Sequence, residues 1–190
     1  MTTICILRHG QTDRNKAKLI QGRGNFDLNS EGFNQAKKTA EYFKNNHEYF
    51  DLICASPLNR AIDTAKTIKE VLGYSDEILI IPEFIEREFG EADGCNIEPN
   101  IYDRIIHDDV IGMEKSYEIQ ERMINAVLNL AKEHKGKRIL VVSHSHAIKG
   151  LLTGLDKNRS FLDQLVNCAI NYFLVDGDEI IIDKVNISAF

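Results

Sequence analysis

Two arginines and two histidines stand at points in the sequence where their side chains could act together on an anion. Arg8 and His9 follow a short apolar run, Arg60 lies near the start of a helical pattern, and His144 follows a second apolar run. A planar guanidinium can grip two oxygens of a phosphoryl group through parallel charged hydrogen bonds. A neutral imidazole can attack phosphorus if a hydrogen bond to its other nitrogen fixes the tautomer. These residue types suggest phosphoryl chemistry, with Arg8 and Arg60 as a clamp and His9 as the nucleophile.

Gly10 and Asn15 strengthen this interpretation of the first arginine-histidine pair. Glycine lets the backbone approach an anion closely, and an amide side chain adds a neutral donor. An isolated arginine-histidine pair at the end of a strand is more often part of a surface ion pair than a catalyst. The added glycine, threonine and asparagine, at their spacing, favour a catalytic site.

The elements that position these residues follow from the hydrophobic pattern. Apolar runs of strand length occur at residues 4–7, 51–55, 78–81 and 138–143. Helical spacing occurs between them and after them, at residues 29–44, 56–73, 117–134 and 147–152, with Ser56 as an N-cap and Pro57 at the first helical position of the second helix. Residues 169–175 and 179–185 indicate a closing hairpin.

This alternation predicts an α/β fold, a three-layer α/β/α sandwich with a central, mostly parallel sheet. Such sheets place their sites at the carboxyl ends of strands. Polar clusters follow three of the predicted strands, at residues 8–10, 56–60 and 143–144. We therefore expect these distant segments to line one pocket.

The 190 residues contain no repeat, low-complexity tract or linker, so we expect one domain over residues 1–190. Residues 83–115 have little periodicity and many charges, which indicates an irregular excursion or lid. The net charge of -6 argues against a general nucleic-acid or anionic-membrane surface. The N-terminus has no basic leader followed by an apolar span, so a cytoplasmic protein is expected.

The four cysteines, Cys5, Cys54, Cys95 and Cys168, show no CxxC spacing, and three of them have apolar neighbours. Buried free thiols are therefore expected rather than a metal site. The partner predicted for the site is a small phosphorylated metabolite. No exposed apolar stripe or heptad decides between a monomer and a homodimer.

The motifs resemble those of the histidine phosphatase superfamily, whose members have a phosphoglycerate mutase-like fold. The signature Arg-His-Gly-x-Ser/Thr-x-x-Asn stands at residues 8–15, and Ser-Pro-Leu-x-Arg-Ala-x-x-Thr-Ala at residues 56–65. The family's Gln-Gly pair is similar to Gln21-Gly22, and its Val-Val-Ser-His block to residues 141–144. The resemblance covers nearly the whole chain. Ser145 and His146 depart from the pattern, because relatives commonly have glycines there.

The resemblance implies roles for individual residues. His9 would form a phosphohistidine and Glu86 would protonate the leaving alcohol, without a metal or other cofactor. The phosphoryl group and the rest of the substrate would be bound by Arg8, Arg60, Asn15, His144, Gln21 and Gly22. Glu86 lies in an acidic stretch, and such a stretch is usually a solvated face. Arg23 and Arg87 are expected to be ordinary surface side chains, and His146 a locally hydrogen-bonded residue at a helix start.

Three functions remain open from the sequence. A phosphatase acting on phosphate monoesters is favoured by the short chain and by the segment Glu86 to Gly94. A cofactor-dependent phosphoglycerate mutase, an isomerase, is the first alternative, but Glu88-Phe89 replaces the His-Tyr of its acid segment. A non-catalytic protein that binds phosphoesters is the second alternative, and the presence of all five predicted catalytic residues counts against it.

Overall fold

The computed structural model describes residues 1–190 and is built around one six-stranded sheet. The strands are β1 (Thr2–Arg8), β2 (Leu52–Ala55), β3 (Leu79–Ile80), β4 (Arg138–Ser143), β5 (Ile170–Asp176) and β6 (Glu179–Ile187). They lie side by side in the order β3-β2-β4-β1-β5-β6. Strands β1 to β4 are parallel, whereas β5 is antiparallel to β1 and forms a hairpin with β6.

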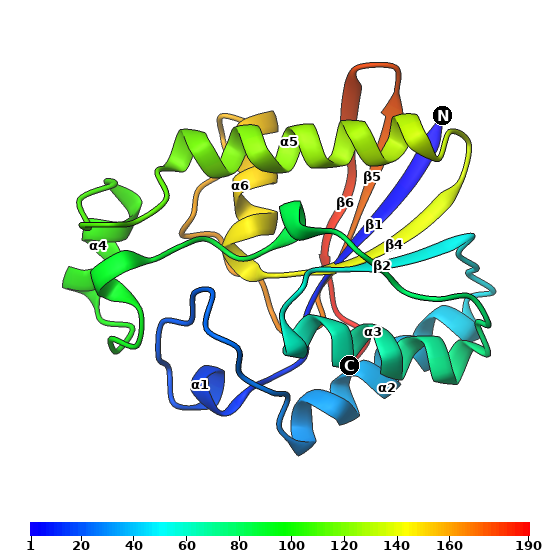
Figure 1. Cartoon of the computed structure of the whole chain (residues 1–190), viewed down its shortest axis with the longest axis horizontal. Coiled ribbons are helices and arrows are strands. Elements are labelled where there is room, and N and C mark those ends of the chain that lie inside the picture. Colours follow the sequence, from blue (N-terminus) through cyan, green and yellow to red (C-terminus); the bar gives the residue numbers. More distant parts are fainter.

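Helices cover both faces of the sheet (Figure 1). On one face α2 (Ser30–Asn45) packs against α3 (Asn59–Leu72), and on the other α5 (Ser116–Glu133) packs against α6 (Ser145–Leu155). The short helices α1 (Asp13–Lys16) and α4 (Pro99–Ile106) lie on the same side of the molecule in Figure 1. The predicted three-layer α/β/α sandwich with a mostly parallel sheet is confirmed.

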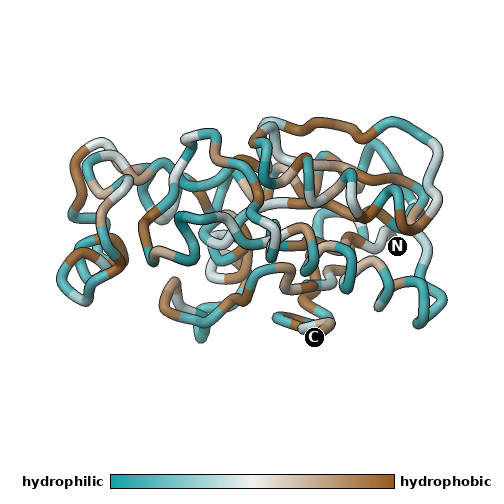
Figure 2. Tube along the Cα trace, turned by 90° about the horizontal axis from the view of Figure 1, so that it is seen from below, coloured by the Kyte–Doolittle hydropathy of each residue, from teal (hydrophilic) through white to brown (hydrophobic).

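The central strands are apolar at successive positions because both of their faces are covered. Ile4 and Ile6 of β1 belong to the core under α5 and α6, whereas Cys5 and Leu7 belong to the core over α2 and α3. Successive strand residues point to opposite faces, so an unbroken apolar run is what a doubly covered strand needs. Hydrophobic and hydrophilic segments alternate along the trace in Figure 2. No helix combines the length and apolarity that a membrane span requires.

One predicted helix start is wrong. Helix α3 begins at Asn59 with Leu58 at its N-cap, rather than with Ser56 as the cap and Pro57 at the first helical position. The hydroxyl of Ser56 lies 2.7 Å from Nε2 of His144 instead. The same hydroxyl accepts only a long hydrogen bond from Leu58 N, at 3.4 Å, so its shorter contact is the tertiary one.

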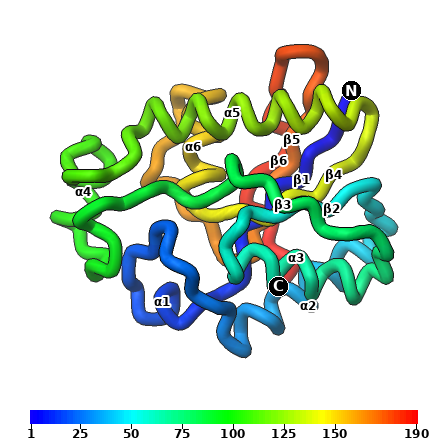
Figure 3. Tube along the Cα trace, in the orientation of Figure 1, coloured from blue at the N-terminus to red at the C-terminus, as the bar shows by residue number.

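The segment of residues 83–115 runs from the β3 edge of the sheet through α4 to the start of α5, as the green tube in Figure 3 shows. The sequence gives little sign of helix α4 there, although Pro99 stands at a favourable position in its first turn. The segment has its own small apolar cluster, in which Phe89, Ile105 and Met113 pack with Ile20 from the loop after α1. The loop and the segment therefore form one packed unit.

The loop after β1 is pressed against the start of α2, and two glycines allow this approach. A Cβ on Gly10 would lie 2.5 Å from the carbonyl oxygen of Gly32, and a Cβ on Gly32 would lie 2.2 Å from that of Gln11. Real side chains do not tolerate such contacts with backbone atoms. Asn29 caps α2 through Gly32 N at 2.9 Å, so the helix start is fixed where the loop passes.

Gly32→Ala should lower the free energy of unfolding by about 1–3 kcal/mol, because the new methyl group forces the two backbones apart. Alanine is otherwise the better helix former, so the loss measures the close approach. Urea unfolding provides the measurement. The matched control Lys37→Ala, at an exposed position of α2, should change the value by no more than about 0.5 kcal/mol. Equal stability of Gly32→Ala and wild type would contradict the packing argument.

Candidate active site

The candidate residues meet where three neighbouring parallel strands end. Arg8, at the end of β1, is in register with Ser143 at the end of β4. His9 N donates to the carbonyl oxygen of Ser143 at 3.0 Å, and Ser56 N, just after β2, donates to that of Val142 at 2.9 Å. The three polar clusters therefore meet at the carboxyl ends of neighbouring strands. They were also expected to line one pocket, but of their residues only Arg8 and His9 line the cavity described below, and no residue of 56–60 or 143–144 does.

His9 is held as one tautomer. Its side chain is buried, and Nδ1 lies 2.7 Å from the carbonyl oxygen of Gly10, which can only accept. Nε2 lies 3.2 Å from Nε of Arg60, which can only donate. Both contacts place the proton on Nδ1 and a lone pair on Nε2. Burial, and then the positive charges of Arg60 and Arg8, lower the pKa of His9 well below 6.5, so the ring is neutral at pH 7.

Arg60 lies directly behind His9 and is fully buried. Its Nη1 donates to the carbonyl oxygen of Gly24 and its Nη2 to that of Gly22, both at 2.8 Å. Burial lowers the pKa of Arg60 to about 10, so the guanidinium stays charged at neutral pH. The loop that contains Gly22 and Gly24 therefore supplies the hydrogen-bond acceptors for this buried charge.

Gln21 and Gly22, predicted to bind substrate, both contact Arg60. With its amide oxygen toward the guanidinium, Gln21 shares the Nε–H of Arg60 with Nε2 of His9, at 2.8 Å and 3.2 Å, and it donates to Oγ1 of Thr12 at 2.7 Å. The carbonyl oxygen of Gly22 accepts the hydrogen bond from Nη2 of Arg60. Gln21 also lines the cavity described below, whereas Gly22 does not. The structure therefore places this pair next to the guanidinium of Arg60.

His144 is fully buried beside His9, with ring centroids 5.1 Å apart. Its Nε2 lies 2.7 Å from Oγ of Ser56, and its Nδ1 has no hydrogen-bond partner. Burial, and then the charge of Arg60, lower its pKa well below 6.5. His144 is therefore a second neutral imidazole within the site.

Glu86 comes from the segment between β3 and α4 and is 4% exposed. Its Oε1 accepts from the backbone N–H groups of Arg87 (2.8 Å) and Ala147 (2.9 Å), and its Oε2 accepts from that of His146 (3.2 Å). The last two donors belong to the first turn of α6, where free N–H groups and the helix dipole attract a carboxylate. This contact anchors an irregular segment to the core of the site.

A cavity opens above His9. It is lined by Arg8, His9, Asn15, Leu19, Ile20, Gln21, Glu86, Phe89, Ile97, Tyr102, Ser145 and His146. Nε of Arg8 is buried without a partner. The oxygen of the Asn15 amide accepts from Thr12 N (3.2 Å) and Asn167 Nδ2 (3.3 Å), which leaves its NH2 group for a ligand. The cavity thus has polar donors at its base, whereas Leu19, Ile20 and Ile97 give it apolar walls. Arg60 and His144 lie behind this surface.

Sequence reasoning missed part of the cavity wall. His146 was expected to bond locally, but its Nε2 lies 3.0 Å from the hydroxyl of Tyr102 in α4, and its ring stacks on Phe161. Nothing in the pattern around Tyr102 indicates this contact. Thr64, whose Oγ1 accepts from Gly10 N at 3.0 Å, was indicated only as a member of the block at residues 56–65.

Arg87 is a correction, because it was expected at the surface and is fully buried. Its Nη2 donates to Oδ1 of Asp108 at 2.6 Å, its Nε donates to the carbonyl oxygen of Glu114 at 2.8 Å, and the guanidinium lies over the ring of Phe161. These contacts explain how the charge is tolerated in the interior. The structure contains no group of three or more His, Cys, Asp or Glu side chains that could hold a metal ion.

Comparisons with known proteins agree with this geometry. The model of the histidine phosphatase superfamily (branch 1) matches residues 4–188. The chain is 34% identical over 180 residues to the uncharacterized phosphatase PhoE of Bacillus subtilis (strain 168), covering 90% of this chain and 87% of that protein. It is 29% identical over 195 residues to a metal-independent phosphoserine phosphatase of Arabidopsis thaliana, covering 97% and 81%.

Solved structures give the same fold. A phosphoserine phosphatase mutant from Entamoeba histolytica, in complex with phosphoserine, matches with a TM-score of 0.83 at 27% identity and covers 98% of this chain and 97% of that one. YhfR of Bacillus stearothermophilus matches with a TM-score of 0.86 and covers 100% and 99%. At 21% identity, the second likeness bears on the fold alone.

The buried histidines predict that the fold loses stability in acid. His9, His144 and His146 all have pKa values well below 6.5, because burial and nearby positive charges disfavour the imidazolium. In the unfolded chain they titrate near 6.5, so below that pH the unfolded state binds more protons than the folded state. Each histidine should then remove up to about 1.4 kcal/mol of stability per pH unit.

Urea unfolding between about pH 5 and 7.5 should show this loss. In His146→Gln, the slope of unfolding free energy against pH should fall by about one histidine's share, whatever the variant's stability at neutral pH. An unchanged slope would show that the pKa of His146 is not lowered in the folded protein.

Proposed function

Because this chain belongs to the histidine phosphatase superfamily, branch 1, we propose that it hydrolyses phosphate monoesters of small metabolites through a phosphohistidine on His9. The observation that carries the proposal is the orientation of the His9 ring. Its Nδ1–H is bound to the carbonyl oxygen of Gly10, and the ring lines a cavity whose base holds Arg8 and Asn15. A neutral imidazole with one fixed lone pair is the form that can attack phosphorus.

In the first step, the lone pair on Nε2 of His9 forms the bond to phosphorus, and the ester P–O bond breaks. The leaving oxygen takes a proton from Glu86, which lines the same cavity. The products of this step are the free alcohol and a phosphohistidine.

In the second step, the Glu86 carboxylate takes a proton from water, and the water oxygen attacks phosphorus. The N–P bond breaks, the electron pair returns to Nε2, and inorganic phosphate leaves. Acid and base roles therefore alternate on one carboxyl group, which regains its proton for the next cycle.

Arg60 has a specific part in this scheme. Its Nε–H donates to the nitrogen that would attack. Once the lone pair of Nε2 forms the bond to phosphorus, that N–H can turn to a phosphoryl oxygen without a large movement. Arg8 and His144 would bind other oxygens with Nε and Nδ1, two buried polar atoms that have no partner in the protein. Satisfying each of them would recover about 1–3 kcal/mol.

Two observations favour hydrolysis of small esters over mutase activity. The relatives named above include phosphatases, one of them a phosphoserine phosphatase. Phe89 lines the cavity where mutases of this family carry tyrosine in their acid segment, and it offers no polar group to a phosphoglycerate. The alcohol part of the substrate would lie against Leu19, Ile20 and Phe89.

In the presence of EDTA, the wild-type protein should release phosphate from 4-nitrophenyl phosphate and from members of a panel of metabolite monophosphates. His9→Ala should reduce this release by about a thousandfold or more, because no other side chain supplies the nucleophile. The control His134→Ala, at the end of α5, should retain wild-type activity.

An inactive wild-type protein would contradict the phosphatase proposal, and a mutase assay with 2,3-bisphosphoglycerate would then test the alternative. An active His9→Ala variant would show that the protein is a phosphatase but that His9 is not its nucleophile.

A further inference from the structure

The segment that carries Glu86 is held by side chains. Each of its four consecutive carbonyl oxygens accepts one such hydrogen bond: Glu83 (2.6 Å) and Ile85 (2.9 Å) from Nη1 of Arg122, Phe84 from Oγ of Ser143 (2.8 Å), and Glu86 from Nε of Arg23 (3.0 Å). Three of these four hydrogen bonds come from the guanidinium groups of Arg122 and Arg23. The position of Glu86 therefore depends on where these two arginines are held.

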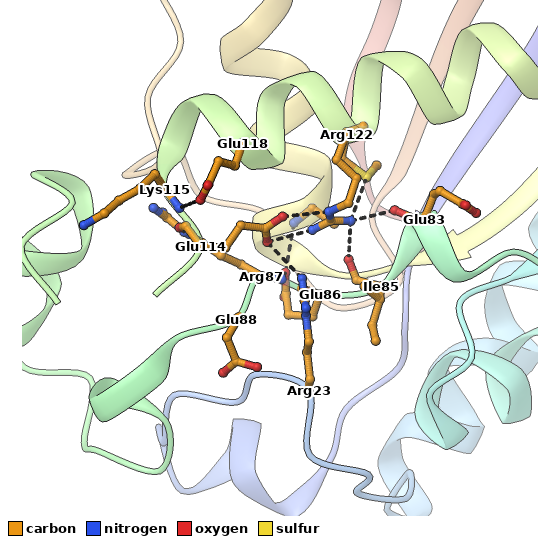
Figure 4. A network of polar contacts seen from close by, with 12 residues as sticks. Arg23, Glu83, Ile85, Glu86, Arg87, Glu88, Glu114, Lys115, Glu118 and Arg122 are labelled. Atoms are coloured by element: carbon orange, nitrogen blue, oxygen red, sulfur yellow. Dashed lines mark hydrogen bonds and ion pairs between the residues drawn. The ribbon is translucent and has the colours of Figure 1, made fainter. Parts of the chain in front are cut away.

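Glu114 holds both arginines (Figure 4). Its Oε1 accepts from Nε of Arg122 at 2.7 Å and its Oε2 from Nη2 at 2.8 Å, which is the bidentate geometry of a strong ion pair. The same Oε2 lies 3.3 Å from Nη2 of Arg23. One carboxylate thus joins α5 to the loop after α1, and the segment bearing Glu86 lies between them.

The backbone of Glu114 is attached to the same segment. Its carbonyl oxygen accepts from Nε of Arg87 at 2.8 Å, and its N–H donates to the carbonyl oxygen of Glu88 at 2.9 Å. Arg87 is in turn the residue whose N–H donates to the carboxylate of Glu86. Glu114 therefore contacts the residues on the carboxyl side of Glu86 as well as the arginines that hold the amino side.

Burial makes this ion pair matter more than a surface one. The side chain of Glu114 is 11% exposed and that of Arg122 is 18% exposed. Removing one partner of such a pair leaves the remaining charge poorly solvated, whereas exposed pairs contribute little. A neutral amide would also turn its NH2 group toward a guanidinium, which repels it.

We propose that Glu114 is a positioning residue for Glu86, holding the proton donor against the leaving oxygen through Arg122 and Arg23. The inference rests on the proposed function, because it concerns the proton donor of that reaction. A positioning role for Glu114 predicts a dependence of the rate loss on the leaving group, which a merely structural role does not. Misplacing a proton donor slows esters whose leaving alcohol needs the proton and spares esters whose leaving group departs unprotonated.

The test compares benzyl phosphate, a poor leaving group, with 2,4-dinitrophenyl phosphate, an activated one. For Glu114→Gln, kcat/KM should fall by about 10–100-fold on benzyl phosphate and by about threefold or less on the activated ester. Glu86→Gln should show the same pattern with a loss of about a hundred- to ten-thousand-fold on benzyl phosphate. The control Glu121→Gln, an exposed neighbour of Arg122 with the same charge change, should match wild type on both esters.

The double variant decides whether Glu114 acts through Glu86. Glu86→Gln with Glu114→Gln should be no slower on benzyl phosphate than Glu86→Gln alone, because the group being positioned is already absent. Additive losses, or an equal loss on both esters from Glu114→Gln, would overturn the inference and leave the proposed function standing. A wild-type protein inactive on both esters would overturn the proposed function and this inference with it.

Thermal unfolding followed by circular dichroism checks that each variant is folded. If Glu114→Gln fails to fold, Arg23→Gln replaces it, because this half-exposed arginine supplies only the bond to the Glu86 carbonyl and one ion pair. It should lose about 3–10-fold on benzyl phosphate alone. An equal loss on both esters would overturn the inference here too.

Discussion

The hydrogen bond between Nδ1 of His9 and the carbonyl oxygen of Gly10 governs the chemistry of the site, because it decides which ring nitrogen carries the proton. Arg60 supports the choice from the other side by donating to Nε2. Burial and two positive neighbours then keep the ring neutral. A charged imidazole has no lone pair to offer, so the environment that is predicted to destabilise the fold in acid would keep the proposed nucleophile neutral at pH 7.

The surrounding loop compensates the buried positive charge of Arg60 beside His9. A fully buried guanidinium costs several kcal/mol unless its donors are satisfied, and the loop at Gly22 and Gly24 supplies two carbonyl oxygens for Arg60. The loop in turn packs through Ile20 on the segment that carries Glu86. The proposed nucleophile His9, the proposed phosphate ligand Arg60 and the proposed proton donor Glu86 are therefore linked by a continuous series of contacts that begins at the ends of β1, β2 and β4.

The fold and the residues at the base of the site could be predicted because short continuous segments of the sequence encode them. The apolar run in β1, the motif at residues 8–15 and the block at residues 56–65 each encode an element and the side chains that follow it. The wall of the site could not be predicted, because its contacts join residues that are far apart in the sequence and belong to no common motif. Tyr102 and His146, which meet in this wall, are separated by 44 positions, and the buried pair Arg87 and Asp108 by 21. A charged residue is expected at the surface until such a partner is known, which is why Arg87 was misplaced.

The central claim is that His9 itself becomes phosphorylated, and rapid quenching of a turnover reaction tests it most directly. Base-quenched wild-type protein should carry one phosphoryl group, stable in alkali and labile in acid, and peptide mass spectrometry should place it on His9. Its formation should be at least as fast as the release of phosphate at steady state. Phosphate release without any covalent intermediate on His9 would mean that water attacks the ester directly, and would contradict the account.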